Sequence, residues 1–218
     1  MKQHTLIKKI LSFLFPEKCA SCEKSGSSLC RECINRFSRS KETELTYAKA
    51  LFQYKDKQVE RTIKNLKNYQ KPELAKVISG LMYSNFLPEI SDLALFGGEK
   101  IILVPIPASN LHMKKRFRNH SLLLAEKFFE NDKNYFEICD CLIKTRHSSP
   151  QSEIKTRESR IKNAENLYKV REKFIPQVRG KTILIIDDIT TTGATIENAK
   201  KALEKSGALE VRAICFAH

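Results

Sequence analysis

The chain has 218 residues and carries 39 Lys and Arg against 25 Asp and Glu, a formal net charge of +14. This length suits one hydrophobic core with a small appendage and is short for two full domains. The basic excess favours a polyanionic partner, because Lys and Arg displace the counterions that surround phosphate groups. The alternative is a proteome in which Lys is simply common, and the charge would then carry no functional meaning.

Residues 6–15 form a short apolar stretch that Lys8 and Lys9 interrupt. Pro16 and Glu17 follow it instead of a cleavage site of small residues, so it does not resemble a secretory signal. No run in the chain approaches the ~20 apolar residues of a membrane span. The stretch predicts a short amphipathic helix that either packs on the protein or associates weakly with the inner membrane surface.

Four cysteines follow as two Cys-x-x-Cys pairs, and a Ser/Gly turn separates the pairs. They are Cys19, Cys22, Cys30 and Cys33. Four thiolates at this spacing fit one tetrahedral Zn²⁺, which is structural because no coordination position stays open. Disulfides, a redox pair and an iron–sulfur cluster are the alternatives. The odd total of seven cysteines indicates a reducing compartment, so we expect zinc and a cytoplasmic location.

The rest of the chain alternates between strand and helix patterns. The expected elements are a strand over 46–54, helices over 59–66 and 74–87, a loop over 88–98, a strand over 101–104, a helix over 121–129, a strand over 136–143, a strand over 182–186, a helix over 195–205 and a strand over 210–217. This order predicts an α/β fold in which helices flank a parallel sheet and ligands bind at the carboxyl ends of its strands. We expect two units, a cysteine segment over 1–40 and an α/β domain over 41–218.

The most informative stretch is the run that ends the strand over 182–186. Asp187 and Asp188 follow four aliphatic residues, and a turn of threonines with Gly193 leads into the next helix. Backbone N–H groups and Thr hydroxyls at a helix N-terminus can hold a phosphate dianion, and glycine lets the backbone approach it. The two carboxylates can accept hydrogen bonds from ribose hydroxyls, directly or through Mg²⁺. This chemistry fits a sugar phosphate.

Other interpretations of this stretch are weaker. A threonine could merely cap the helix, and the two aspartates could be an ordinary strand end, but adjacent buried acids are costly without partners. The chain has no G-x-x-x-x-G-K-[ST] sequence and lacks the three glycines of a dinucleotide-binding turn. Nucleotide sites of those two types are therefore not expected.

Residues 183–195 resemble the signature with which type I phosphoribosyltransferases bind phosphoribosyl pyrophosphate (PRPP). The resemblance implies that Asp187 and Asp188 contact the ribose hydroxyls, with Mg²⁺ bound alongside PRPP, and also act in any catalysis. It further implies two groups of PRPP-binding residues, one around the 5-phosphate and one on the pyrophosphate side. These are Thr190, Thr191, Thr192, Gly193, Ala194 and Thr195, and Pro107 and Ala108.

The chain further resembles the ComF family of competence-associated proteins, which pair this fold with an N-terminal cysteine segment. The matching stretches are residues 63–67, 103–107, 116–119 and 150–152, with Arg157 and Arg160 after the last. The family usually reads Arg-Gly-Phe-Asn-Gln after its first strand, whereas this chain has Arg-Phe-Arg-Asn-His over 116–120. The resemblance implies a type I phosphoribosyltransferase-like fold with a small Cys₄ zinc segment.

Two basic stretches are candidates for nucleic-acid binding. The first has four cations around an aromatic ring, a combination that suits single-stranded DNA or a pyrophosphate group. The second is a long glycine-free stretch, which by position is the mobile loop of these transferases. The candidate nucleic-acid residues are Lys114, Lys115, Arg116, Phe117, Arg118 and Arg160. A solvated helix start is the alternative for the first stretch.

The sequence leaves two functions open. The first is a PRPP-binding protein of the ComF type that handles incoming single-stranded DNA in natural transformation, together with other DNA-uptake proteins. The second is an active phosphoribosyltransferase that acts on an unidentified base or amine. No His lies in the signature and only Asp187 and Asp188 could serve as general base, so the sequence favours the first.

Overall fold

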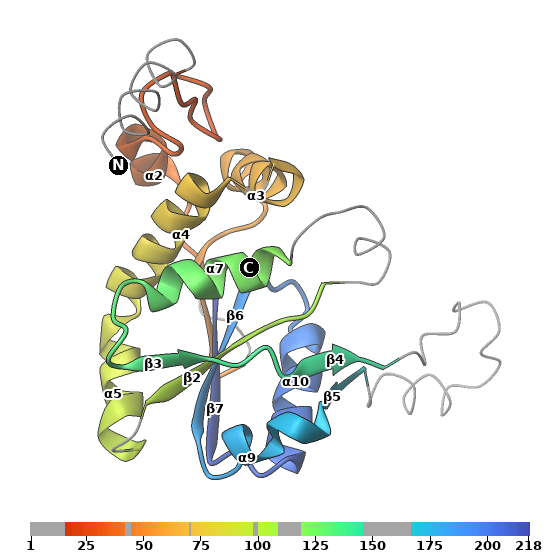
Figure 1. Cartoon of the computed structure of the whole chain (residues 1–218). Helices are drawn as coiled ribbons and strands as arrows, with labels where there is room; N and C mark the ends of the chain where they lie inside the picture. The colour runs from red at the N-terminus through yellow and green to blue at the C-terminus, as the bar shows by residue number, and fades with distance from the viewer. Residues whose placement is uncertain (1–15, 42–44, 70, 98–99, 109–118, 146–166) are drawn as a thin grey trace, which may run out of the picture.

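Five parallel strands form one sheet in the order β1-β7-β6-β2-β3 (Figure 1). The computed structural model describes residues 16–41, 45–69, 71–97, 100–108, 119–145 and 167–218. The strands are β1 Ala48–Phe52, β2 Ile101–Pro105, β3 Phe136–Ile138, β6 Thr182–Ile189 and β7 Glu210–Ala217. The predicted α/β fold with a parallel sheet is therefore confirmed.

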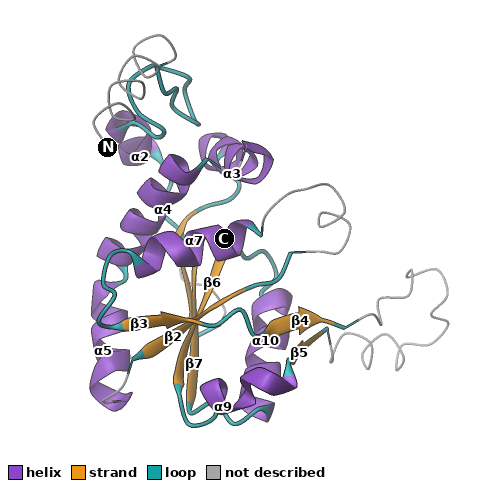
Figure 2. Ribbon diagram, viewed as in Figure 1, coloured by secondary structure: helices purple, strands orange, loops and turns teal. Residues whose placement is uncertain are grey.

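Helices cover both faces of the sheet (Figure 2). They are α2 Arg31–Arg36, α3 Lys57–Tyr69, α4 Pro72–Asn85, α5 Leu87–Gly97, α7 His120–Phe129, α9 Ile175–Val178 and α10 Ala194–Lys205, with a 3₁₀ turn at Glu172–Phe174. Alternate residues of each strand enter two separate cores. Leu103 and Leu184 pack with α4 and α7, whereas Val104 and Ile185 pack with α10. Burial on both faces explains why these strands are continuous apolar runs.

The direction of the chain across the sheet changes at β2. From β2 the chain passes through α7 to β3 on one side, and it then returns to β6 on the other side of β2. The carboxyl ends of β2 and β6 thus flank the point where the strand order reverses. Ligands of open α/β sheets bind in the crevice at such a point.

The structure corrects two of the predicted secondary-structure elements. The loop over 88–98 is helical in α5, because Pro88 stands in the first turn, where its missing N–H is not needed, and Ile90 and Leu93 are buried. The single strand over 136–143 is interrupted after Ile138. Its second part becomes β4, Leu142–Lys144, which pairs antiparallel with β5, Tyr168–Val170, in a separate hairpin.

The N-terminal segment is attached to the sheet through three phenylalanines. The Phe37 ring centroid lies 5.1 Å from that of Phe52 on β1, and the Phe52 centroid lies 5.2 Å from that of Phe216 on β7. All three side chains are buried in one core, which also contains Cys19 and Cys33. The domain boundary at residue 40 stays a prediction. The helix expected over 6–15 lies outside the described residues, and none of the described helices is long and apolar enough to cross a membrane.

Replacing Phe52 by Ala should lower the free energy of unfolding by about 3–5 kcal/mol, because it leaves a cavity where the cysteine segment meets the sheet. Urea denaturation measures the change. Leu209→Ala is the control, since Leu209 is 65% exposed and its truncation should cost less than about 0.5 kcal/mol. Equal costs for the two variants would contradict this packing.

Candidate functional site

The four predicted zinc ligands meet at one point. The sulfur atoms of Cys19, Cys22, Cys30 and Cys33 all lie within 4.8 Å of one another, and no disulfide links them. Cys19 Sγ lies 3.9 Å from Cys33 Sγ, and Cys22 Sγ lies 3.7 Å from Cys30 Sγ. Zn–S bonds of about 2.3 Å in a tetrahedron place neighbouring sulfurs about 3.8 Å apart. The donor set and its spacing therefore fit a structural Zn²⁺.

The surrounding backbone favours the thiolate form of one of these ligands. Burial by itself raises the pKa of the Cys19 thiol, but backbone N–H groups of Cys22, Cys30 and Ser21 outweigh it and lower the pKa to about 6. The Cys30 N–H donates to Cys19 Sγ at 3.3 Å. Zinc binds cysteine as the thiolate, so this hydrogen bonding supports metal binding.

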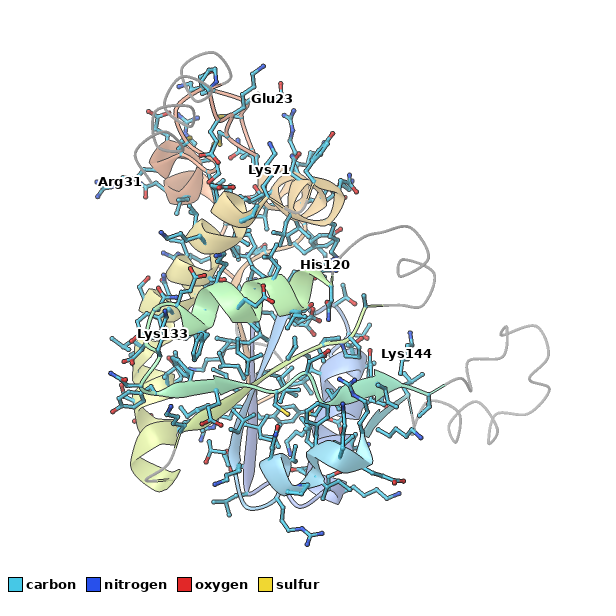
Figure 3. The ribbon with its side chains drawn as sticks, viewed as in Figure 1. Glu23, Arg31, Lys71, His120, Lys133 and Lys144 are labelled. Atoms are coloured by element: carbon cyan, nitrogen blue, oxygen red, sulfur yellow. The ribbon has the colours of Figure 1, made fainter. Side chains whose placement is uncertain are left out.

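Helix α3 connects the cysteine segment with the sheet. Asn65 Nδ2 donates to the carbonyl of Ala20 at 2.8 Å, and Arg61 forms an exposed ion pair with Glu23. Figure 3 shows Glu23 and α3 at the same end of the molecule. The last turn of α3 carries Lys67, whose Nζ lies 3.2 Å from Asp188 Oδ2 at the end of β6.

The carboxylate pair, Asp187 and Asp188, is buried, with 7% and 2% of each residue exposed. Asp187 Oδ1 accepts hydrogen bonds from the Ser121 hydroxyl at 2.8 Å and from the Asp188 N–H at 2.9 Å. Burial and the charge of Asp188 nevertheless raise the pKa of Asp187 to about 7. A carboxyl group with such a pKa can exchange a proton near neutral pH.

Asp188 has two electrostatic partners, but one of its oxygens can still accept a hydrogen bond. His120 Nε2 lies 3.5 Å and Lys67 Nζ lies 3.2 Å from Asp188 Oδ2. Within the described residues neither contact has hydrogen-bond geometry, and Asp188 Oδ2 accepts none. A buried carboxylate oxygen without a hydrogen bond is costly, so this atom is available to a ligand hydroxyl or a metal ion.

The loop of hydroxyl residues after β6 has the features expected of a phosphate site. Gly193 precedes α10 with φ of 74°, and a Cβ at this position would clash with the Leu45 side chain. The N-cap residue Gly193 has no side chain to cap the helix, and the Ala194 N–H donates a long hydrogen bond of 3.5 Å to Thr192 Oγ1. The first turn of α10 therefore keeps N–H groups for an anion. The buried Thr190 hydroxyl also finds no partner among the described residues.

These groups surround one cavity of about 430 Å³. Its wall contains the carboxylate pair, the loop from Thr190 to Thr195, and Pro107 and Ala108 after β2. Asn119 caps α7 and holds the β2 end, because its side chain accepts from the Ser121 N–H and donates to the Ile106 carbonyl. The N-termini of α7 and α10 thus both face the cavity, where their dipoles favour an anion.

The structure brings together the predicted PRPP residues, although their roles stay predictions. Lys114, Lys115, Arg116, Phe117, Arg118 and Arg160 lie outside the described residues. The cavity wall also contains residues that were not predicted as site residues from the sequence, among them Lys67, His120, Ser121, Lys144 and Tyr168. Figure 3 shows His120 at the beginning of α7 and Lys144 on β4. Two of them could have been predicted from the resemblance to the ComF family. Lys67 is the last residue of the matching stretch 63–67, and His120 stands where the usual Arg-Gly-Phe-Asn-Gln motif has its glutamine.

Comparison with known proteins identifies the class. Residues 124–218 match the phosphoribosyl transferase domain family. A competence protein ComFC from Streptococcus pneumoniae is 30% identical over 131 residues, which cover 60% of this chain and 52% of that protein. The chain therefore spans about half the length of this relative. A solved structure of the allosteric regulatory enzyme of purine biosynthesis covers 66% of this chain and 26% of that one, with 19% identity and a TM-score of 0.39.

The match over residues 124–218 shows that the chain contains a phosphoribosyltransferase-type domain, and a cysteine cluster that fits zinc precedes this domain. Within this class the chain is similar to the competence protein over 60% of its length, and a cysteine cluster precedes the matched domain.

Purified protein should contain about one Zn²⁺ per chain, and Cys19→Ser or Cys33→Ser should lower this content. Because the cluster packs on α3, metal loss should also lower the melting temperature. Elemental analysis and thermal unfolding measure the two effects. Cys139→Ala is the matched control, since it removes a buried thiol outside the cluster. Iron, or no metal under reducing conditions, would contradict the assignment.

The carboxyl group of Asp187 has a pKa of about 7 in the folded protein, against an ordinary value of 3.8. Between these values the unfolded chain releases the proton and the folded protein keeps it. The contribution of Asp187 to the free energy of unfolding should therefore fall as the pH rises from about 4 to about 7. Asp187→Asn should remove this component, so that the variant gains stability relative to the parent as the pH rises.

Urea denaturation at a series of pH values tests this difference. Asp92→Asn is the control, because it makes the same substitution at an exposed position. Parallel curves for the parent and Asp187→Asn would show that Asp187 titrates in the ordinary range.

Proposed function

We propose that this protein binds PRPP, or a related ribose 5-phosphate ligand, in the cavity at the ends of β2 and β6. The observation that carries the proposal is the buried carboxylate pair beside the uncapped N-terminus of α10. Asp188 Oδ2 and the Thr190 hydroxyl are buried polar atoms without hydrogen bonds among the described residues. A sugar phosphate supplies hydroxyl groups that can donate to the carboxylate oxygen and phosphate oxygens that can accept from the threonine.

Each part of the ligand has a complementary surface in this proposal. Residues 190–195 hold the 5-phosphate through N–H groups and hydroxyls, and the carboxylate pair accepts from the ribose hydroxyls. Pro107 and Ala108 face the pyrophosphate. Asp188 Oδ2, which accepts no hydrogen bond among the described residues, also fits Mg²⁺, which prefers oxygen ligands and neutralises phosphate charge when bound. Lys67 adds a cation at the same edge.

We also propose that the protein handles single-stranded DNA during natural transformation, in the cytoplasm and with other DNA-uptake proteins. Two observations support this proposal. The chain is similar to a protein named as a competence protein, and its net charge of +14 favours a polyanionic partner. Lys114–Arg118 and Arg160 remain candidates for this contact.

A second candidate function is phosphoribosyl transfer to an unidentified base or amine. It is favoured by the pKa of Asp187 near 7 and by His120 in the same cavity, since both can accept a proton from an attacking group. A screen for pyrophosphate release with bases and amines tests it. Release that depends on an acceptor and on His120 would favour this candidate over ligand binding alone.

Asp187→Asn combined with Asp188→Asn should weaken PRPP binding at least about 100-fold, because each hydrogen bond to a charged group is worth about 1.5–3 kcal/mol. Titration calorimetry with PRPP and Mg²⁺ measures the affinity, and circular dichroism checks that the variant is folded. Glu73→Gln with Asp92→Asn is the matched control, since it removes the same charge from two exposed positions. An affinity equal to that of the parent would overturn the proposed site.

A further inference from the structure

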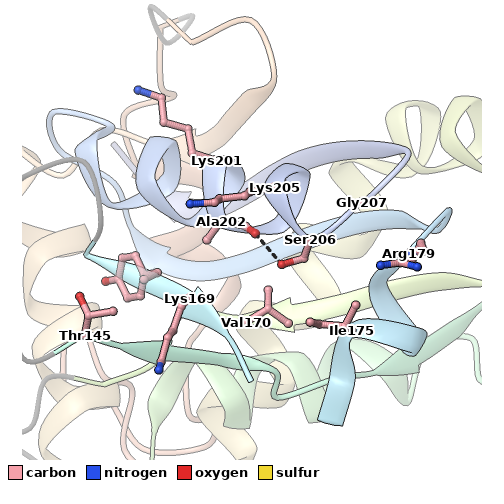
Figure 4. Close-up of a pocket in the computed structure, with 11 residues that line it drawn as sticks. Thr145, Lys169, Val170, Ile175, Arg179, Lys201, Ala202, Lys205, Ser206 and Gly207 are labelled. Atoms are coloured by element: carbon pink, nitrogen blue, oxygen red, sulfur yellow. Dashed lines mark hydrogen bonds between the residues drawn. The ribbon is translucent and has the colours of Figure 1, made fainter. Parts of the chain in front are cut away.

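A second cavity, of about 570 Å³, lies beside the candidate site (Figure 4). It is formed by β5, by the end of α9 and by the last turns of α10. Tyr168 lines both this cavity and the one that contains the carboxylate pair. We call this second cavity the basic groove. Neither the family match nor the PRPP site gives it a role.

The basic groove has four cations and no acid among the described residues that line it. Lys169 comes from β5, Arg179 follows α9, and Lys201 and Lys205 come from α10 (Figure 4). All four are exposed. Lys201 Nζ lies 3.2 Å from Glu197, so its charge is partly compensated. The other three form no ion pair with any residue in the described ranges. Their charges are therefore available to a partner.

Most carbonyl groups of the last turn of α10 already accept hydrogen bonds within the protein. The carbonyls of Ala202, Leu203 and Glu204 accept hydrogen bonds from Ser206, Ala208 and Gly207, respectively. The Gly207 carbonyl accepts from the Gly180 N–H at 2.7 Å. These three carbonyls of the last turn are thus satisfied within the protein.

One of the four cations is held in place by packing. Gly207 has φ of 91°, and a Cβ at this position would lie 3.2 Å from Arg179 Cγ. The aliphatic part of the Arg179 side chain therefore packs against the Gly207 backbone. Between the cations, Val170, Ile175 and Ala202 supply an apolar wall. A cationic rim over an apolar wall suits a ligand that alternates phosphates with sugars and bases.

We propose that the basic groove binds the backbone of single-stranded nucleic acid. Its charged side chains are all hydrogen-bond donors, and the carbonyls of Ala202, Leu203 and Glu204 at the end of α10 are already engaged. A phosphodiester chain needs only donors, whereas an acidic peptide also brings N–H groups that need acceptors. The inference rests on the proposed DNA handling and assigns a surface to it, separate from the PRPP site.

The test is a triple variant, Lys169→Gln, Arg179→Gln and Lys205→Gln. Fluorescence anisotropy with a labelled oligothymidine at several salt concentrations gives the slope of log affinity against log salt. The magnitude of this slope should decrease by up to about 2, since each phosphate that the protein no longer neutralises removes about 0.7. PRPP affinity should stay at the parental value, because none of the three residues lines that site.

The matched control removes the same charge from three exposed lysines elsewhere, as Lys57→Gln, Lys76→Gln and Lys133→Gln. It should keep most of the parental slope. If both variants lose affinity equally, only net charge matters and the groove assignment is overturned, while DNA handling stands. If the parent protein binds no oligothymidine, DNA handling and the groove assignment both fail, whereas PRPP binding is judged separately. Equal or tighter binding of a polyglutamate peptide would overturn the proposal and assign the groove to an acidic protein.

Discussion

The burial of two neighbouring carboxylates at the end of β6 is the constraint around which this structure is arranged. Side by side, with 7% and 2% exposed, Asp187 and Asp188 lose hydration and repel each other. Compensation comes from separate parts of the chain: Ser121 from α7, Lys67 from α3 and His120 from the first position of α7. The compensation is incomplete, since the pKa of Asp187 stays raised and Asp188 Oδ2 accepts no hydrogen bond within the described residues. A site that is left unsatisfied in this way gains most from a ligand.

Helix α3 makes the cysteine segment part of this arrangement. Its buried residues Ile63 and Leu66 share a core with Cys19 and Cys33, and its last turn carries Lys67 to Asp188. A metal that fixes the cysteine cluster therefore also fixes one side of the carboxylate pair. This metal would act through α3, at a distance from the cavity that contains the carboxylate pair. A closed four-cysteine cluster can in this way support the position of Lys67, although all four metal positions are taken by protein.

The sequence predicts most accurately the sites whose residues are close together in the chain. The aliphatic run, the two acids, the threonines and Gly193 are contiguous, and the cysteines recur at fixed spacing, so both centres could be found without a fold. Lys67 and His120 lie in or next to stretches that resemble the family, but their place beside the carboxylates, like that of Tyr168, depends on the packing that brings α3, α7 and β5 to the end of β6. The two wrong elements have the same origin. Pro88 suggests a break unless its place in the first turn of α5 is known, and β4 depends on pairing with β5, which lies far from it in the sequence.

Tyr168 links the two cavities on this edge of the molecule. It is 8% exposed, and burial together with the charge of Asp187 raises the pKa of its hydroxyl, while a hydrogen bond with Thr195 lowers it. Tyr168 thus lines the cavity that contains the carboxylate pair and also forms part of the wall of the basic groove on β5. Strand β5 pairs with β4 through three register pairs, and Leu142, Tyr168 and Val170 of this hairpin are buried in the core that also contains α10 residues. Because Tyr168 belongs to the walls of both cavities, any shift of this side chain would change the shape of both.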